Sequence, residues 1–291
     1  MTERQSVNSQ PAGTPEEGAG DLAEEAVTAA LGDRPVRTLI AAISSEAEAM
    51  RWCRAEEEVP EGAVVVAQHQ IGLRDRNGLP WPVEPQAGLA FSVILKPHLA
   101  PIRAGRLYLA GVSALLDALP GEGMAEWPDT IRDDDGGLIG GVVTRVSAGV
   151  KGIDWCIVTF YVVKATGGRA QLAAQLLKGF DEHWAQPDAA LQGFFKERCR
   201  TIGRRIRATF LPLGPKARRV EGEARDITGG GGLITVVEEE RKVTLQIADI
   251  GRTEYLSEDG TVESEKLLSS PLGDWPLLGD VAPPSGEGWT P

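Results

Sequence analysis

The sequence predicts an α+β protein, with a mixed β-sheet flanked by helices followed by a small domain of β-strands. Two observations carry this prediction. Between residues 36 and 202, short β-branched runs alternate with segments whose apolar residues recur at helical spacing. From Arg204 onward the pattern changes to short strands separated by turns, which is typical of a β-barrel of roughly 50 residues. With 291 residues, of which 42% are hydrophobic, the chain is long enough for both parts.

The elements follow from local patterns in chain order. The β-branched run AVVVAQHQ suits a buried strand, and a helix that begins near Glu46 ends before Pro60. By the same criteria we expect strands at residues 36–43, 63–70, 89–97, 138–146 and 155–163, and helices at 46–58, 102–119, 170–184 and 188–202. In the small domain, the strands are RRIRATFL, ARRVEGEARDI, GGLITVVEE and KVTLQIADI, and the glycines at 229–232 form a hairpin loop.

The net charge of −12 belongs to the two ends of the chain. Residues 1–34 carry seven acidic and two basic residues, and residues 253–291 carry eight acidic residues and one lysine, so the stretch between them is neutral. Both ends are rich in Pro, Gly and Glu, and we expect them to be disordered. Residues 21–31 are the exception, because they have helical spacing behind an Asp cap signal. We therefore divide the chain into an acidic tail (1–34), an α/β domain (35–202), a β-barrel domain (203–252) and a second acidic tail (253–291).

Several classes of protein are not supported by the sequence. The three cysteines and three histidines have no metal-ligand spacing, and no GxSxG, GxxxxGK or HExxH motif occurs. There is no run of eighteen apolar residues, and the acidic start is unlike a secretory signal. We expect a cytoplasmic protein without a metal site and without a membrane association.

Three stretches resemble the biotin protein ligases of the biotin/lipoate ligase family. The first, AQHQIGLRDRNGLPW at residues 67–81, is similar to a strand that ends in Gln and enters a GRGRRGRxW loop. The second, EWPDTI at 126–131, stands where the family has KWPND, and the third, GGLIGGVV at 136–143, where it has GxKxAGIL. VEGEARDITGGGGLIT, at 220–235, resembles a motif of the C-terminal domain. The resemblance implies a biotin/lipoate ligase-like catalytic domain followed by an SH3-like β-barrel.

The resemblance also implies a chemistry. Such a ligase joins the carboxylate of biotin to the α-phosphate of ATP, with Mg²⁺, and then transfers the acyl group to a lysine of a biotin carboxyl carrier domain. A loop rich in Gly and Arg suits these anions, because backbone N–H groups and guanidinium groups both donate to them. The ligand-binding candidates that this resemblance gives are Ser44, Ser45, Gln70, Arg74, Arg76, Gly78, Trp81, Trp127 and Gly140.

The sequence departs from the family where the chemistry occurs. Glu126 stands where the family places its catalytic lysine, which reverses a charge beside two anions. Leu73 and Asp75 replace two loop glycines. The bulky Phe160 and Tyr161 stand in a strand that the family makes glycine-rich, and we expect them to fill the cavity. Further changes are Glu46, Asp129 and Thr130, which stand where the family has Asn, Asn and Asp.

The retained residues have structural alternatives. Arg74 and Arg76 flank Asp75, so an exposed, self-neutralised turn is as good an interpretation as anion binding. Trp127 is better explained as a core or loop anchor than as a ligand contact, because a tryptophan buries a large area. Gln70 can equally be a polar residue at the end of a strand.

Three functions follow, of which we favour the first. In the first, this is a divergent ligase-like protein, impaired or inactive in biotin activation, that acts as a binding or scaffold partner. Its partners in this hypothesis are a carrier domain, an active ligase homologue or a second copy of itself in a homodimer. In the second, it is an active ATP-dependent ligase of biotin, lipoate or a related acid, in which Lys151 or Lys164 replaces the missing cation. In the third, the acid-free basic segment 198–219 binds nucleic acid or an acidic partner, and of these two we favour the acidic partner. We do not expect nucleic acid there, since no nucleic-acid motif accompanies the segment and the acidic tails can neutralise it.

Overall fold

The computed structural model describes residues 20–55, 58–84, 87–121 and 123–263. Its main element is a seven-stranded sheet of order β1-β2-β3-β7-β6-β5-β4, in which β1 and β2 are parallel and the other neighbours antiparallel. The sheet is therefore mixed, as predicted. Its strands are β1 (Val36–Ala42), β2 (Val64–Gln70), β3 (Leu89–Leu95), β4 (Met124–Glu126), β5 (Thr130–Arg132), β6 (Leu138–Gly149) and β7 (Gly152–Val162).

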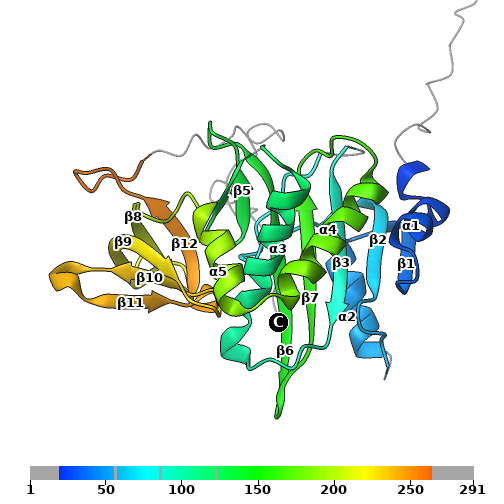
Figure 1. Cartoon of the computed structure of the whole chain (residues 1–291), viewed down its shortest axis with the longest axis horizontal. Helices are drawn as coiled ribbons and strands as arrows, with labels where there is room; N and C mark the ends of the chain where they lie inside the picture. Colours follow the sequence, from blue (N-terminus) through cyan, green and yellow to red (C-terminus); the bar gives the residue numbers. More distant parts are fainter. Residues whose placement is uncertain (1–19, 56–57, 85–86, 122, 264–291) are drawn as a thin grey trace, which may run out of the picture.

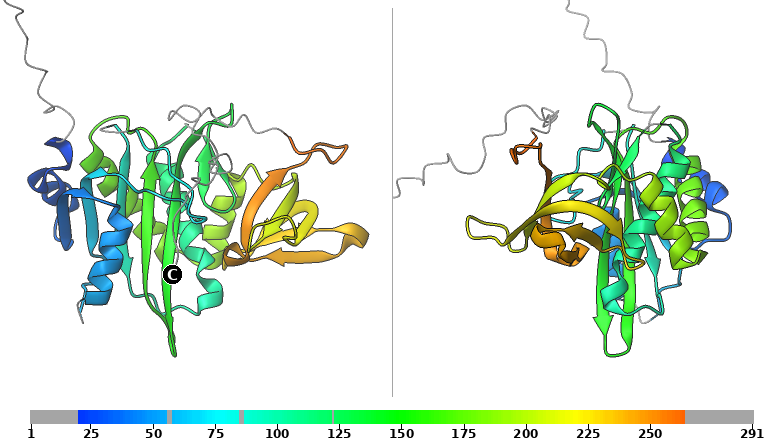
Figure 2. Two further views of the ribbon diagram at one scale, coloured as in Figure 1. Left: turned by 180° about the vertical axis from the view of Figure 1, so that it is seen from behind. Right: turned by 60° about the vertical axis from the view of Figure 1, so that its left-hand side comes forward.

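Helices cover the two faces of this sheet unequally (Figures 1 and 2). One face packs against α3 (Gly105–Ala118) and α4 (Arg169–Ala185), in the largest hydrophobic core. The opposite face carries α2 (Ser45–Ala55), whose Ala49 and Trp52 pack on Val65, Ile94 and Ile157. Because α2 covers only part of this second face, the remainder is left for the loop that follows β2.

The small domain is a five-stranded antiparallel sheet of order β11-β10-β9-β8-β12. It lies beside β4 and β5 and next to α5 (Asp188–Glu197) (Figure 1). The predicted glycine hairpin joins two of its strands, where the amide of Thr228 donates to the carbonyl of Gly232. The strands are β8 (Arg205–Phe210), β9 (Arg219–Ile227), β10 (Leu233–Val236), β11 (Lys242–Leu245) and β12 (Ile250–Tyr255).

The two sheets share one hydrophobic core and are joined by close backbone contacts. At Gly231, which has φ of +86°, an added Cβ would lie 2.4 Å from the carbonyl oxygen of Gly105 at the start of α3. Only glycine fits such an approach in that conformation. Nearby, the indole N–H of Trp127 donates to the carbonyl oxygen of Gly231 at 2.9 Å. The glycine run therefore positions the small domain against the large one.

The helix predicted at residues 21–31, within the first tail, is present and packs on the large domain. Gly20–Leu22 forms a short 3-10 helix, and α1 (Glu24–Leu31) packs on α4 through buried Val27 and Leu31. The carboxylate of Asp21 accepts hydrogen bonds from the backbone N–H and the guanidinium of Arg169. Asp21 thus caps α4, whose own N-cap residue is a glycine. Residues 1–19 lie outside the described part.

Other boundaries also differ from the sequence predictions. The helix predicted at 188–202 ends at Glu197, because the chain beyond it pairs with β4 through Ala125 and Arg200. The short strands β4 and β5 were not predicted, and β12 extends past the expected boundary at residue 252. Residues 264–291 of the second predicted tail lie outside the described part. In the described ranges, we find no helix with the length and hydropathy needed to cross a membrane.

We expect Asp21→Ala to lower the free energy of unfolding by about 1 kcal/mol, the typical loss for a helix cap. Burial raises the pKa of Asp21, but the hydrogen bonds from Arg169 outweigh it and hold that pKa below its ordinary value. This contribution is therefore present at neutral pH and is lost as the pH falls below about 4. Urea unfolding at pH 7 and pH 3 measures both effects. The exposed Glu24 provides the control, since Glu24→Ala should change neither.

Candidate functional site

The sequence-predicted site residues lie mainly on the α2 face of the sheet. The N-terminus of α2 supplies two serines, the end of β2 supplies Gln70, and residues 72–81 fold as a loop over the same face. The structure thus brings the two serines and Gln70 together on one face of the sheet, next to the loop. They lie above β3, β7 and β6, whose side chains on this face form the floor of the site.

A polar network joins the start of α2 to the sheet. The amide of Ser45 donates to Oε1 of Gln70 at 2.6 Å, and Nε2 of Gln70 donates to the carbonyl oxygen of Ala90 at 2.7 Å. The hydroxyl of Ser92 lies 2.9 Å from that of Ser45 and 2.8 Å from that of Thr159. Both amide ends of Gln70 are therefore used by the protein. Ser44 caps α2, with its hydroxyl accepting from the amide of Ala47 at 3.0 Å.

Trp81 fills the space between the loop and the sheet. Its ring lies 4.7 Å from the ring of Tyr161, centroid to centroid, and the two form a buried cluster with Ala90 and Val143. A Cβ added to Gly141 would lie 2.6 Å from the Trp81 ring, so the indole rests directly on the backbone of β6. Partly buried Leu73, Val83 and Leu138 close this cluster.

The prediction that Tyr161 and Phe160 both fill the cavity is right for the first and wrong for the second. Side chains alternate across a strand, so neighbours in β7 face opposite sides of the sheet. Tyr161 packs on the α2 face, and its hydroxyl donates to the carbonyl oxygen of Arg74 at 3.1 Å. Phe160 lies in the core under α4, 5.1 Å from Phe91 in a stacked arrangement.

The loop is closed by bonds within itself. Oδ1 of Asp75 accepts from the amides of Asn77 and Leu79, both at 2.8 Å. The guanidinium of Arg74 donates to the carbonyl oxygen of Gly78 at 2.7 Å, and Gly78 has φ of +85°. Arg74 therefore bonds to the backbone of its own turn.

Arg76 connects three parts of the chain. Its Nε lies 2.7 Å from Oδ2 of Asp129, just after the Trp127–Pro128 peptide, and its Nη1 donates to the carbonyl oxygen of Ile250 in β12. Both side chains of the ion pair are 11% exposed. Burial raises the pKa of Asp129 to about 6, although the charge of Arg76 acts to lower it. Arg76 thus joins the loop to the small domain.

A second buried carboxylate lies at this site. Glu46, in the first turn of α2, accepts from Nε of Arg145 in β6 at 2.9 Å, while its Oε2 is buried with no partner among the described residues. The charge of Glu46 acts with burial to raise the pKa of Tyr161, so the two side chains are close. Arg145 was not among the candidates; its position in a strand of alternating burial gave no signal of this pairing.

The remaining candidates have structural contacts. Glu126 pairs with Arg132, with Oε1 and Nε 3.1 Å apart. Trp127 is 1% exposed and bonds to the small domain, as expected of a core anchor. At Gly140, a Cβ would lie 2.5 Å from the carbonyl oxygen of Tyr161, so this glycine serves strand packing. The sequence comparison missed Leu138. When GGLIGGVV is aligned with GxKxAGIL, Leu138 stands at the position of the lysine in that pattern. In the structure, Leu138 packs beside Trp81.

The segment 198–219 makes many contacts within the chain. Arg207 pairs with Glu221 at 2.7 Å, and Arg204 pairs with Glu263, a residue of the predicted acidic tail. Arg198 and Arg218 lie over the rings of Phe194 and Phe210. Elsewhere, the described residues hold no group of three His, Cys, Asp or Glu side chains arranged to bind a metal ion.

Comparison with known proteins places this geometry in context. No family model matches the sequence. A curated relative, the biotin--[acetyl-CoA-carboxylase] ligase of Mycobacterium tuberculosis (strain ATCC 25618 / H37Rv), is 25% identical over 236 residues, which span 73% of this chain and 87% of that protein.

Solved structures share the fold. The biotin protein ligase of Aquifex aeolicus in complex with biotin and ATP superposes with a TM-score of 0.59 at 18% identity, covering 76% of this chain and 99% of that one. A biotin protein ligase-like protein of unknown function from a Silicibacter species gives 0.53 at 14% identity, over 74% and 95%. The resemblance to biotin protein ligases that the sequence predicts is thereby confirmed, and the chain has their fold.

The buried Asp129 should make the free energy of unfolding depend on pH. Its folded pKa of about 6 lies above its ordinary value of 3.8, so the ionised carboxylate costs stability at neutral pH, and this cost disappears as the pH falls through 6. Between pH 7 and pH 4, we expect the wild type to gain about 2 kcal/mol of unfolding free energy relative to Asp129→Asn. Parallel pH profiles of the two proteins in urea unfolding would contradict this. The exposed Asp134 offers a control, since Asp134→Asn should follow the wild type.

Proposed function

We propose that this protein, which has the biotin protein ligase fold, does not form biotinyl-adenylate and acts instead by binding another protein. The observation that carries the proposal is the buried cluster of Trp81 and Tyr161, which occupies the α2 face beside Gln70 and Ser45. In this proposal the small domain keeps the SH3-like form that the resemblance implies.

The residues present do not fit biotin and ATP. The side-chain oxygen and nitrogen of Gln70 are both hydrogen-bonded to the protein backbone. The indole of Trp81 lies against Gly141, where a ligand would approach the backbone. A biotin ring would have to displace a side chain that buries a large apolar area. The indole of Trp81 therefore occupies the space over Gly141, while a pocket of about 260 Å³ remains beside Gln70, lined also by Leu73 and Ala90.

The charges of the site also oppose the two anions. Arg76 is paired with Asp129, and Leu138 stands at the lysine position of the quoted motif. The buried Oε2 of Glu46 adds a carboxylate near Tyr161. A carboxylate and a phosphate brought together here would meet acidic groups in a site of low dielectric, where repulsion is strong.

The protein partner that we propose is a biotin carboxyl carrier domain or an active ligase homologue. The support is the shared fold together with the name of the curated relative, which acts on acetyl-CoA carboxylase. Size-exclusion chromatography of the purified protein with a carrier domain, in its biotinylated and unbiotinylated forms, tests this partner. A complex with either form supports the proposal, and separate elution of all components excludes the carrier domain.

The alternative function is an active ligase that attaches biotin or a related acid. It is favoured by the retention of Gln70 and Arg76, and it needs another cation in the site. Lys151 lies in the turn between β6 and β7, at the far end of that long hairpin from the loop (Figure 1). Lys164 follows β7, near the segment at Glu84 and Ala87, and is the better placed of the two lysines.

Calorimetric titration with a non-hydrolysable biotinyl-adenylate analogue tests whether the site binds ligand. We expect no heat of binding at millimolar analogue, because Trp81 covers Gly141 and Arg76 is paired with Asp129. Binding in the micromolar range, lost in Arg76→Met, would instead support the active ligase.

A second variant tests whether the indole of Trp81 is what prevents binding. Trp81→Ala removes the indole and should lower the free energy of unfolding by about 3 kcal/mol, as for other buried large-to-small changes. We expect it to bind biotin measurably, whereas Trp155→Ala should not, since Trp155 packs under α2 on the same face. Circular dichroism and urea unfolding confirm that each variant is folded under the conditions of the titration.

A further inference from the structure

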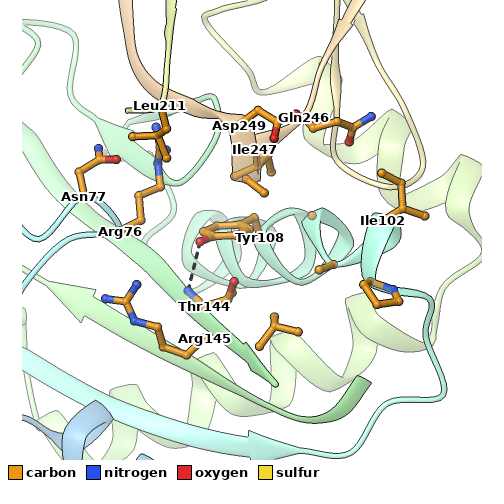
Figure 3. Close-up of a pocket in the computed structure, with 15 residues that line it drawn as sticks. Arg76, Asn77, Ile102, Tyr108, Thr144, Arg145, Leu211, Gln246, Ile247 and Asp249 are labelled. Atoms are coloured by element: carbon orange, nitrogen blue, oxygen red, sulfur yellow. Dashed lines mark hydrogen bonds between the residues drawn. The ribbon is translucent and has the colours of Figure 1, made fainter. Parts of the chain in front are cut away.

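A groove of about 600 Å³ lies between the two sheets, beside the candidate site, with which it shares Arg76 and Arg145. The start of α3 and the middle of β6 form one wall, and the segment just before β12 forms the other (Figure 3). The ring of Tyr108 lies at its centre. Its lining includes Arg76, Ile102, Tyr108, Arg145, Leu211 and Ile247.

The groove has a basic end and an apolar end. In Figure 3, Arg76 and Arg145 lie on one side of Tyr108, and Ile102 lies on the other. Arg145 uses Nε to bind Glu46, and its side chain is 34% exposed. Ile102 is 68% exposed and Leu211 47% exposed, so large apolar side chains face solvent at the groove.

The backbone of β6 is also open to this groove. The neighbouring strand β5 pairs with β6 only as far as Gly141. Beyond it, the amide of Thr144 donates to the hydroxyl of Tyr108 at a long 3.3 Å, and none of the described strands pairs with this edge. An open strand edge beside apolar side chains suits an extended segment of polypeptide.

The chain itself contains a segment of matching composition. Residues 264–291 hold eight large hydrophobic residues, most of them between 267 and 281, together with four acidic residues and one lysine. Residues 1–19 hold only Met1 and Val7 as large hydrophobic residues. The C-terminal segment is therefore rich in large apolar side chains, which complements a groove with exposed apolar side chains.

We propose that residues 267–281 bind in this groove and cover it. The described chain ends at Glu263, which pairs with Arg204, while β12 begins at Ile250, next to the groove residue Asp249. The six residues of β12 span about 20 Å. The 28 residues that follow Glu263 can extend to about 90 Å, so they reach the groove readily. This inference is independent of whether the ligase site binds biotin.

Hydrogen exchange compares the full chain with a variant that ends after Glu263 and so keeps every residue of the described fold. We expect amides at 102–108 and 144–146 to exchange at least about threefold faster in the truncated protein, because a bound segment suppresses local opening. Peptides from α4 should exchange equally in both. In the full chain, the triple variant Trp275→Ala, Leu277→Ala and Leu278→Ala should behave like the truncation, and Trp289→Ala like the wild type.

Binding in trans identifies the occupant. A synthetic peptide of residues 264–291 should bind the truncated protein with a Kd of about 100 μM. In the full chain, tethering at an effective concentration of about 1 mM then gives a ratio of bound to free segment of about ten. Ile102→Asp, at an exposed position, should abolish this binding, while Val150→Asp, on the turn between β6 and β7, should leave it unchanged. Circular dichroism of both variants checks that they fold.

Two results would overturn the proposal. The first is equal exchange in the full and truncated chains together with no binding of the peptide at millimolar concentration. The second is a full-length dimer, measured by light scattering, that Ile102→Asp converts to a monomer, because a second copy of the chain would then occupy the groove.

Discussion

The buried ion pair between Arg76 and Asp129 is the contact on which the arrangement of the site depends. It fixes the loop after β2 to the segment that enters β5, and the same guanidinium reaches the backbone of β12 in the small domain. A buried charge that loses its partner is costly, so the pair holds the loop in one position. With the loop fixed, Trp81 is held against Tyr161 and against the backbone of β6 at Gly141.

The arginines that the sequence suggested for ligand binding thus hold the fold together. Arginines in a loop bind an anion equally well whether it is a phosphate or a carboxylate of the protein. Here Asp129 supplies that carboxylate to Arg76, and Glu46 supplies one to Arg145. These two ion pairs neutralise the arginines within the structure, and under our proposal the site therefore does not attract the anions of a ligand.

Much of the fold was predictable, because periodicity reports burial directly. The strands of the large sheet and the helices α2, α3 and α4 follow their apolar patterns, and Trp127 behaves as the core anchor that its size predicts. The short strands β4 and β5 were missed because three residues carry no measurable period. The cap that Asp21 provides to α4 joins residues 148 positions apart, and no local pattern can reveal such a contact.

For the site, the sequence indicated which residues gather on one face but not what each contacts. That Arg74 bonds to its own loop while Arg76 crosses to β12 depends on the tertiary position of the loop. Alternation along β7 would have separated Tyr161 from Phe160, and the quoted motif would have marked Leu138. Arg145 had no such signal, since only packing brings it to Glu46.

The central claim is that the filled and neutralised site does not activate biotin. Its most direct test is incubation of the purified full chain with biotin, ATP and Mg²⁺, followed by mass-spectrometric detection of biotinyl-adenylate. The biotin ligase of Aquifex aeolicus, which shares the fold, serves as the positive control. Our account predicts no biotinyl-adenylate above the level of a protein-free blank. Stoichiometric biotinyl-adenylate would contradict it and would show that the loop opens to admit both substrates.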